Sequence, residues 1–331
     1  MTPIEIKKNT GLKEDFSDSK LVESLKRAGS DSDTAKKILV FVKKRLYPGI
    51  TTNQIYRMAF EQLKKASKNY AANYSLKKAI LGFGPSGYFF EKFVAAMFRE
   101  MGYETEVEKI FKGRCVDHEV DVVAVKDGHT AFMECKFHNT PTKKNDVKTA
   151  LYVQARHLDL KESGDAPDFD DYYLVSNAPF SKDAIQYSQC VGLRLIGLNS
   201  PDEKNIHAII RELRLHPITC LKRLRVRDKN KLMELGVMLC REVIENPQVL
   251  KDIGLPKNEQ RSILNEIKAI IKSRPVVKGE SNNKNNGNDN NNEKSDDEDN
   301  SNEEHINKDN TNSLTPLIPS IHNQNNQDEE I

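Results

Sequence analysis

Two short segments separated by a tight-turn sequence place the strongest constraint on how this chain can fold. Residues 118–125 and 130–136 mix β-branched and apolar side chains with acids, a pattern typical of β-strands. The four residues between them, 126–129, include an Asp-Gly pair, which favours a tight hairpin turn. We therefore expect the two segments to pair as neighbouring strands of one sheet.

The side chains of these strands bring acids and an amine together. Residues two apart in a strand share a face, so Glu134 and Lys136 point the same way while Cys135 points to the other side. If the hairpin forms, Asp121 lies beside them, and the two carboxylates can hold a hard divalent cation through oxygen. An acid pair, a cation and a lysine in one place can break a phosphodiester bond.

The length and composition of the chain frame this hypothesis. The 331 residues allow two or three domains. The sequence has neither a secretory leader nor an apolar run of about 18 residues, so we expect a cytoplasmic protein with no membrane partner. The five cysteines are widely spaced and form no Cys-x-x-Cys pair, which argues against a zinc ribbon or a disulfide framework.

The charge of the chain is divided between a basic body and an acidic end. Residues 278–331 hold 4 basic and 13 acidic residues, whereas the rest of the chain holds 47 basic and 36 acidic residues. The basic body favours a polyanionic partner such as DNA, and a solvated basic surface is the alternative. Residues 275–331 are too poor in apolar side chains to fold, so we predict a disordered acidic tail. This tail either solubilises the protein or competes with nucleic acid for the basic body.

Residues 1–82 form a first unit with a mostly helical pattern. A short strand or hairpin opens it, Ser17 or Asp18 can cap a first helix, and Thr51 or Thr52 can cap a third. The characteristic pieces are Ile6-Lys7-Lys8 with Gly11, Phe16, Lys20-Leu21, Ala28-Gly29, Ile50-Thr51 with Ile55, and Tyr70-Ala71-Ala72-Asn73-Tyr74. In their identity and order they resemble the ATP-cone, a small regulatory nucleotide-binding domain of ribonucleotide reductases and their repressors.

This resemblance implies a nucleotide site in the first unit. In the ATP-cone family a basic pair and the lysine that opens the first helix approach the nucleotide phosphates. The matching residues here are Lys7, Lys8 and Lys20, which the resemblance implies as ligands of ATP or dATP. Ammonium groups and a helix N-terminus both favour phosphate. Without the resemblance, Lys7 and Lys8 would be read as a solvated pair on a strand.

A glycine-rich segment, 82–87, follows as a hinge or tight turn, and it lacks the Gly-Lys-Ser/Thr ending of a phosphate loop. Residues 88–101 then predict a helix with an apolar face. Glu91 is the notable residue of this helix. By its spacing alone, Glu91 is a surface carboxylate.

Strands and helices alternate through the rest of the central region, 83–200. Strands are predicted at 104–111, 119–125, 131–137, 172–177 and 193–198, and helices at 145–158 and 182–190. Such alternation indicates an α/β layer with a mixed sheet flanked by helices. With Glu91 on a helix, Asp121 on a strand and Glu134-Cys135-Lys136 on the next, the region resembles the PD-(D/E)xK nuclease superfamily, particularly its Mrr-like restriction endonucleases.

The nuclease resemblance implies a role for each residue of this set. Asp121 and Glu134 would be Mg²⁺ ligands, aided by the backbone carbonyl of Cys135. Lys136 would position or activate the attacking water and stabilise charge on the phosphate, and Glu91 would support the metal or its water. The chemistry is consistent, because Mg²⁺ prefers oxygen ligands and acidifies a bound water, and a lysine stabilises developing negative charge.

Several neighbouring residues are further candidates. Glu119 shares the face of Asp121 and is either another ligand or part of the solvent-exposed end of the strand. On the helix after the site, Tyr152 and Arg156 share a face and Gln154 is offset from them. Related nucleases often use a glutamine on this helix, which implies Gln154. We expect three nearby lysines to contact DNA phosphates rather than base edges: Lys143, Lys144 and Lys148.

The last folded region, 201–274, is predicted to be a helical extension. Apolar residues recur at helical spacing over 213–224 and 229–244, which predicts a helix in each range, and a final helix is predicted to end near residue 271. The extension resembles helix-hairpin-helix modules that bind the DNA backbone, and a helical cap packed on the nuclease sheet is the alternative.

Taken together, these patterns predict an α/β protein with a mostly α N-terminal ATP-cone, a central restriction-endonuclease-like mixed sheet, a helical extension and a disordered tail. The predicted function is a cytoplasmic Mg²⁺-dependent DNA endonuclease of the type IV restriction or DNA-repair type. Its ATP-cone would bind adenine nucleotide and regulate cleavage if nucleotide and DNA prefer the same domain arrangement. A catalytically silent, nucleotide-responsive DNA-binding regulator is the alternative, nucleotide hydrolysis has no supporting motif, and a homodimer is left open.

Overall fold

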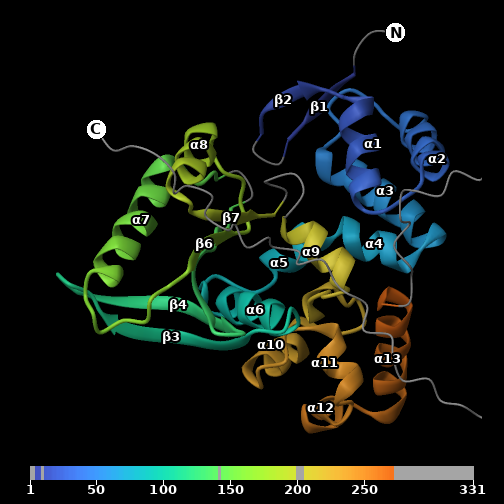
Figure 1. The fold of residues 1–331 in the computed structure, drawn as a ribbon. Helices are drawn as coiled ribbons and strands as arrows, with labels where there is room; N and C mark the ends of the chain where they lie inside the picture. The colour runs from blue at the N-terminus through green and yellow to red at the C-terminus, as the bar shows by residue number, and fades with distance from the viewer. Residues whose placement is uncertain (1–3, 9–10, 141–142, 199–204, 272–331) are drawn as a thin grey trace, which may run out of the picture. The chain divides into compact units, whose positions relative to one another are not determined.

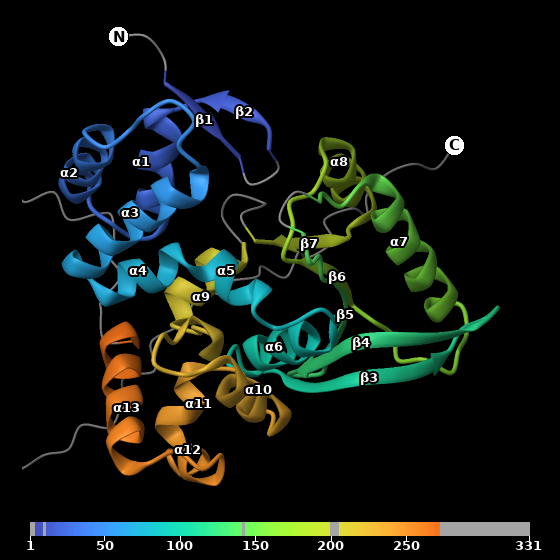
Figure 2. The ribbon, with the colours of Figure 1, turned by 180° about the vertical axis from the view of Figure 1, so that it is seen from behind.

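The computed structural model describes residues 4–8, 11–140, 143–198 and 205–271, and its elements follow the α/β order expected from the sequence (Figure 1; Figure 2). The predicted acidic tail, 275–331, lies outside the described residues. In this described part of the chain, no helix combines the length and the apolar composition needed to cross a membrane. All five cysteines are free thiols.

The first part of the chain is a small antiparallel hairpin followed by helices. Its elements are β1 (Glu5–Lys7), β2 (Lys13–Asp15), α1 (Asp18–Arg27), α2 (Ser32–Lys43), α3 (Thr52–Ala66), α4 (Lys68–Tyr74) and α5 (Leu76–Leu81). Ser17 caps α1 by accepting a hydrogen bond from the backbone of Lys20, and Thr51 forms a capping box with Gln54 at the start of α3. The apolar stripes of α1 to α4 meet in a shared core, as the spacing predicts.

A five-stranded mixed sheet forms the centre of the next part of the chain (Figure 1). Its strands, in spatial order, are β3 (Glu104–Lys112), β4 (Asp117–Lys126), β5 (His129–Lys136), β6 (Asp171–Ser176) and β7 (Arg194–Gly197). The first three strands pair antiparallel and the last three pair parallel. The sheet is therefore mixed, as predicted.

The β4–β5 hairpin forms where the sequence predicts it. Lys126 pairs with His129, so the loop has two residues. Both loop residues have positive φ angles, 53° at Asp127 and 79° at Gly128, which is the type I′ geometry that matches the twist of the strands. The turn fixes the strand register and hence which acidic side chains face each other.

Helices cover both faces of the sheet. The helices are α6 (Tyr88–Arg99), α7 (Val147–Lys161) and α8 (Lys182–Val191). Phe98 of α6 packs edge-on against Tyr173 of β6, whereas His157 of α7 stacks on the adjacent Tyr172 at 4.0 Å between ring centroids. Because neighbouring residues of a strand point to opposite faces, α6 and α7 lie on opposite sides of the sheet.

The C-terminal extension is helical but divided differently from the prediction. Its elements are α9 (Ile206–Leu213), a 3-10 turn η1 (Ile218–Cys220), α10 (Val226–Glu234), α11 (Cys240–Glu245), α12 (Gln248–Asp252) and α13 (Lys257–Ile271). The predicted helix over 213–224 is wrong, and the one predicted over 229–244 is divided into α10 and α11. Arg214 ends α9 in a left-handed conformation with φ of 60°, and Gly236, with φ of 82°, separates α10 from α11.

A buried hydrogen-bond network joins α4 to the C-terminal helices. Asn73 donates through Nδ2 to the backbone oxygen of Ala28 at 3.0 Å and to Oδ1 of Asn69 at 3.1 Å, and its Oδ1 pairs with Nε2 of His216 at 2.8 Å. Asn69 in turn donates to the backbone oxygen of Ile270 at 2.7 Å. Burial lowers the pKa of His216 to about 4, so the ring is neutral and donates its Nε2 proton to Asn73.

Replacing Asn73 with alanine is expected to destabilise the protein by about 2–4 kcal/mol, because it leaves buried polar groups of Ala28 and His216 without partners. The change in the free energy of unfolding is measured by urea titration. Asn53→Ala, at an exposed position of α3, is the matched control. Equal unfolding midpoints for the two variants would show that the network contributes no stability.

Candidate active site

The two acids predicted as metal ligands face each other across the β4–β5 hairpin. The register pairs Val122 with Met133, and continuing it by one residue places Asp121 opposite Glu134. Oδ2 of Asp121 accepts a hydrogen bond from the backbone N–H of Cys135 at 2.6 Å. This bond fixes one carboxylate beside the strand that carries the other.

Glu134 is held by Arg156 of α7, and Arg156 is itself bonded to Tyr152 of the same helix. Nη1 of Arg156 lies 2.5 Å from Oε2 of Glu134, and Nη2 of Arg156 donates to the hydroxyl of Tyr152 at 2.5 Å. The ion pair is largely shielded from solvent, with 9% of the Arg156 side chain and 12% of the Glu134 side chain exposed. Charge pairs so enclosed are geometrically defined, so Arg156 orients the Glu134 carboxylate.

The carboxylates crowd one another. Burial raises the pKa of Asp121 to about 7, with the negative charge of Glu134 as the next cause. Burial also raises the pKa of Glu134, against the opposing positive charges of Arg156 and Lys136. Each ionised acid therefore makes the ionisation of the other less favourable, and a divalent cation bound between them would relieve the repulsion.

The helix acid belongs to the same cluster. Glu91 lies in the first turn of α6. Burial raises the pKa of Glu91 to about 7, and three nearby carboxylates add to the shift: Glu108, Glu119 and Glu134. The fold thus puts Glu91 within electrostatic reach of the strand acids, although spacing alone had made it a surface residue.

Lys136 lies at the exposed end of β5. Its positive charge is among the causes that lower the pKa of Glu134, so the ammonium group lies on the side of the acids. The intervening Cys135 is buried and faces the opposite side of the sheet, as the strand alternation predicts.

Asp121 and Glu134 are the two carboxylates that this part of the sheet offers to a metal ion. Among the described residues, no group of three or more His, Cys, Asp or Glu side chains is arranged to hold a metal ion. Mg²⁺ is commonly bound through one or two carboxylates and keeps several waters. Asp121 and Glu134 supply carboxylate oxygens of that kind.

Gln154 is not brought to the acids. Its Oε1 accepts a hydrogen bond from the hydroxyl of Tyr172, which also bonds to the backbone oxygen of Val191. The helix face that reaches Glu134 carries Tyr152 and Arg156 instead. The sequence showed that these two residues share a face, but it did not assign them a place in the site.

Glu108 is a further residue that the sequence analysis missed. It has a positive φ of 53°, which is unusual for a residue with a side chain. The β3–β4 pairing runs from Val107 with Val122 to Lys109 with Val120, so Glu108 lies opposite Asp121 where the ladder is interrupted. Positive φ at such a residue is detectable only in a structure.

The predicted nucleotide ligands partly converge around the N-terminal hairpin. Nζ of Lys8 lies 2.8 Å and Nζ of Lys20 lies 3.1 Å from Oε2 of Glu14. Their hydrogen bonds lower the pKa of Glu14, with Lys8 as the larger cause. Lys7 is exposed on β1 and forms an isolated bridge with Thr51. The structure brings Lys8 and Lys20 together and leaves Lys7 at the neighbouring position on the strand.

Three family models match consecutive stretches of the chain. An ATP cone domain covers residues 4–80, a restriction endonuclease domain covers residues 85–200, and an AF1548-like C-terminal domain covers residues 216–271. The protein thus carries an ATP-cone domain followed by an Mrr-like restriction endonuclease domain, and the resemblances of these two regions drawn from the sequence are confirmed.

The chain is similar to an uncharacterized protein of Archaeoglobus fulgidus, with 35% identity over 179 residues that make up 54% of this chain and 99% of the relative. The protein therefore belongs to the AF1548-like family. A solved protein of unknown function, AF1548, matches 56% of this chain and 98% of its own at 35% identity, with a TM-score of 0.48. Protein VC1899 from Vibrio cholerae matches at 15% identity over 58% of this chain and 54% of its own, with a TM-score of 0.26.

Proposed function

We propose that this protein is a magnesium-dependent DNA endonuclease that hydrolyses phosphodiester bonds. The observation that carries the proposal is the pairing of Asp121 and Glu134 on adjacent strands, with the charge of Lys136 close to Glu134. The restriction endonuclease model matched over residues 85–200 supports the same reaction class and supports DNA as the substrate.

Each residue of the cluster has a role in this proposal. Asp121, Glu134 and the backbone carbonyl of Cys135 would hold Mg²⁺, which supplies an acidified water and positive charge for the phosphate. Lys136 orients the attacking water and stabilises charge that develops on the phosphate. Glu91, whose pKa of about 7 suits proton exchange near neutral pH, supports that water.

Substrate and nucleotide would bind at separate places. Exposed lysines before and at the start of α7 would contact DNA phosphates: Lys143, Lys144 and Lys148. The ATP-cone would bind ATP or dATP through Lys7, Lys8 and Lys20, in a hairpin where a carboxylate already gathers two of these ammonium groups. Nucleotide would regulate cleavage if it favours the same domain arrangement as DNA.

One observation favours a second candidate function. Arg156 already contacts one oxygen of Glu134, so Arg156 and a metal ion would compete for this carboxylate. If the ion pair wins, the protein is a nucleotide-responsive DNA-binding regulator that does not cut.

The proposal is tested by incubating purified full-length protein with supercoiled plasmid in Mg²⁺ or in EDTA. Wild-type protein is expected to nick or linearise plasmid only with Mg²⁺, and Lys136→Met is expected to lower the rate by about 10²-fold or more, because it removes charge stabilisation at the phosphate. Lys182→Met, which removes an exposed lysine of α8, should cleave like wild type.

The same assay distinguishes the alternatives. Cleavage by Lys136→Met at the wild-type rate would assign the activity to a contaminant. DNA retention that responds to ATP, without any strand being cut, would support the silent regulator. Repeating the assay with ATP, dATP and Lys20→Met tests the nucleotide site, since this variant should alter the nucleotide response and leave basal cleavage unchanged.

A further inference from the structure

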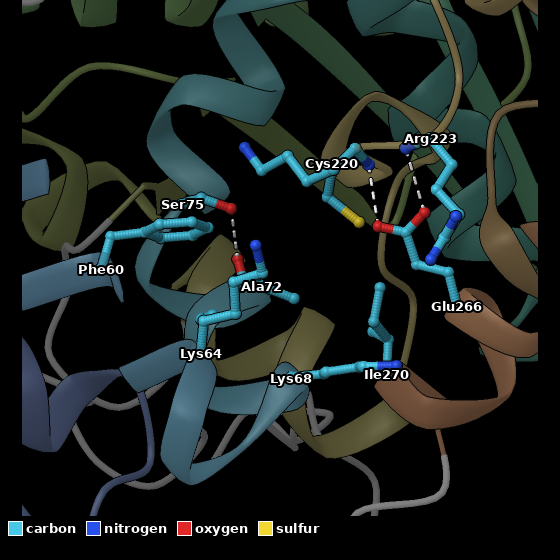
Figure 3. A pocket seen from close by; sticks show the side chains of 11 residues that line it. Phe60, Lys64, Lys68, Ala72, Ser75, Cys220, Arg223, Glu266 and Ile270 are labelled. Atoms are coloured by element: carbon cyan, nitrogen blue, oxygen red, sulfur yellow. Dashed lines mark hydrogen bonds between the residues drawn. The ribbon is translucent and has the colours of Figure 1, made fainter. Parts of the chain in front are cut away.

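A cavity of about 230 Å³ lies between α3, α4 and the C-terminal helical extension, apart from the nuclease cluster (Figure 3). One wall comes from the ATP-cone domain and includes Phe60 and Ala72. The opposite wall comes from the segment after η1 and from α13, and it includes Ile270. Figure 3 shows side chains of both walls around one hollow.

The cavity carries an excess of positive charge. Four cationic residues line it against a single acid: Lys64, Lys68, Lys222 and Arg223, with Glu266 as the acid. The Glu266 carboxylate already accepts hydrogen bonds from the backbone N–H groups of Lys222 and Arg223, at 2.9 and 3.1 Å. Within the described residues, none of the four cations has a carboxylate oxygen within ion-pair distance of its side-chain nitrogens.

Lys222 is the cation that contacts the aromatic ring of the apolar wall. Its Nζ lies 4.9 Å from the centroid of the Phe60 ring. Burial lowers the pKa of Lys222, and the positive charge of Lys78 adds to the effect. An ammonium group placed among like charges gains more from a bound anion than an isolated one does.

From this geometry we infer a binding site for a small organic phosphate that bridges the ATP-cone domain and the C-terminal extension. Lysine and arginine together recognise phosphate, while Phe60, Ala72 and Ile270 offer apolar contact to the organic part. The volume of about 230 Å³ is below the range of about 300–1,000 Å³ typical of drug-sized ligands, so the occupant is a sugar-sized phosphate monoester.

This site is separate from the hairpin of the ATP-cone. Lys8, which follows β1, and Lys20 of α1 gather at Glu14 of β2, whereas the cavity is built from α3, α4 and the C-terminal extension. Because both walls must be present for the ligand to bind, its binding stabilises their association.

The test is calorimetric titration of the full-length protein with ribose 5-phosphate and, separately, with inorganic phosphate. Ribose 5-phosphate should bind more tightly than inorganic phosphate, and Lys222→Met/Arg223→Met should weaken its affinity about tenfold or more. The substituted side chains leave the backbone hydrogen bonds to Glu266 in place. Lys36→Met/Lys65→Met removes the same charge from exposed positions outside the cavity and should bind like wild type.

Three outcomes would overturn the inference. Equal affinity of the cavity variant and wild type, with loss only in Lys8→Met/Lys20→Met, would place all phosphate binding at the hairpin. Equal affinity for inorganic phosphate and ribose 5-phosphate would remove the role of the apolar wall. Loss of duplex DNA affinity in the cavity variant, without ribose 5-phosphate binding in wild type, would assign these cations to the DNA backbone. No arm of this test requires cleavage, so it stands or fails independently of the nuclease proposal.

Discussion

Asp121→Asn is expected to lower Mg²⁺-dependent DNA cleavage by about 10³-fold or more and, at the same time, to stabilise the metal-free protein. Cleavage falls because the substitution removes a charged metal ligand and leaves the amide a weak one. Stability rises because burial and Glu134 raise the pKa of Asp121 to about 7, so the ionised carboxylate is unfavourable near pH 8. One pKa unit corresponds to about 1.4 kcal/mol, so a gain of about 1–2 kcal/mol is expected after the weaker hydrogen bonding of the amide is allowed for.

The two effects are measured by single-turnover plasmid nicking and by urea unfolding in EDTA. The introduced amide would still offer an oxygen to the backbone N–H of Cys135, so the strand pairing should persist. Asp117→Asn is the matched control, because Asp117 is an exposed acid at the start of the same strand. A variant that cuts at the wild-type rate, or that loses stability, would contradict the role assigned to Asp121.

The β4–β5 hairpin was predictable because its determinants are local. The Asp127-Gly128 pair sets the turn, and the turn sets the register that places Asp121 opposite Glu134. The class of the central domain followed from the same local pattern, since a mixed sheet with flanking helices needs only the order of strands and helices.

The partner of Glu134 was not predictable in the same way. In α7 the buried residues Ala150 and Val153 mark the face that meets the sheet. Gln154 and Arg156 lie on either flank of that face, and only the direction of the helix across the sheet decides which flank meets Glu134. That direction depends on packing against other strands, so the sequence favoured Gln154 through the nuclease resemblance, and the structure places Arg156 there.

The division of the C-terminal extension depended on features that the sequence pattern hides. Arg214 adopts a left-handed conformation that non-glycine residues seldom adopt, so the end of α9 had no clear signal. The buried contact of His216 with Asn73 likewise joins residues 143 positions apart. Such long-range contacts are set by tertiary packing and not by local propensity.

Magnesium is expected to stabilise the protein more near pH 8 than near pH 5, by a difference of about 2–3 kcal/mol at a concentration about 100 times the dissociation constant. In the folded state the pKa of Asp121 and that of Glu91 are raised to about 7, whereas an unfolded carboxyl group has a pKa near 4. The folded state therefore binds more protons between about pH 4 and pH 7, and the stability that these protons provide is lost as the pH rises through 7.

The same protons oppose metal binding at low pH, since Mg²⁺ needs ionised carboxylates as ligands. Near pH 8 the acids are ionised and repel each other, so binding of Mg²⁺ raises the free energy of unfolding most at that pH.

Two buried histidines also make stability depend on pH. Burial lowers the pKa of His207 and that of His216 to about 4, so the free energy of unfolding of the metal-free protein rises with pH between about pH 4 and pH 6.5 on their account. The histidine contribution does not depend on Mg²⁺. The difference between the melting temperatures in Mg²⁺ and in EDTA, taken at each pH, therefore reports only the contribution of the acids. Equal differences at both pH values, or a difference retained in Asp121→Asn, would show that Mg²⁺ binds elsewhere.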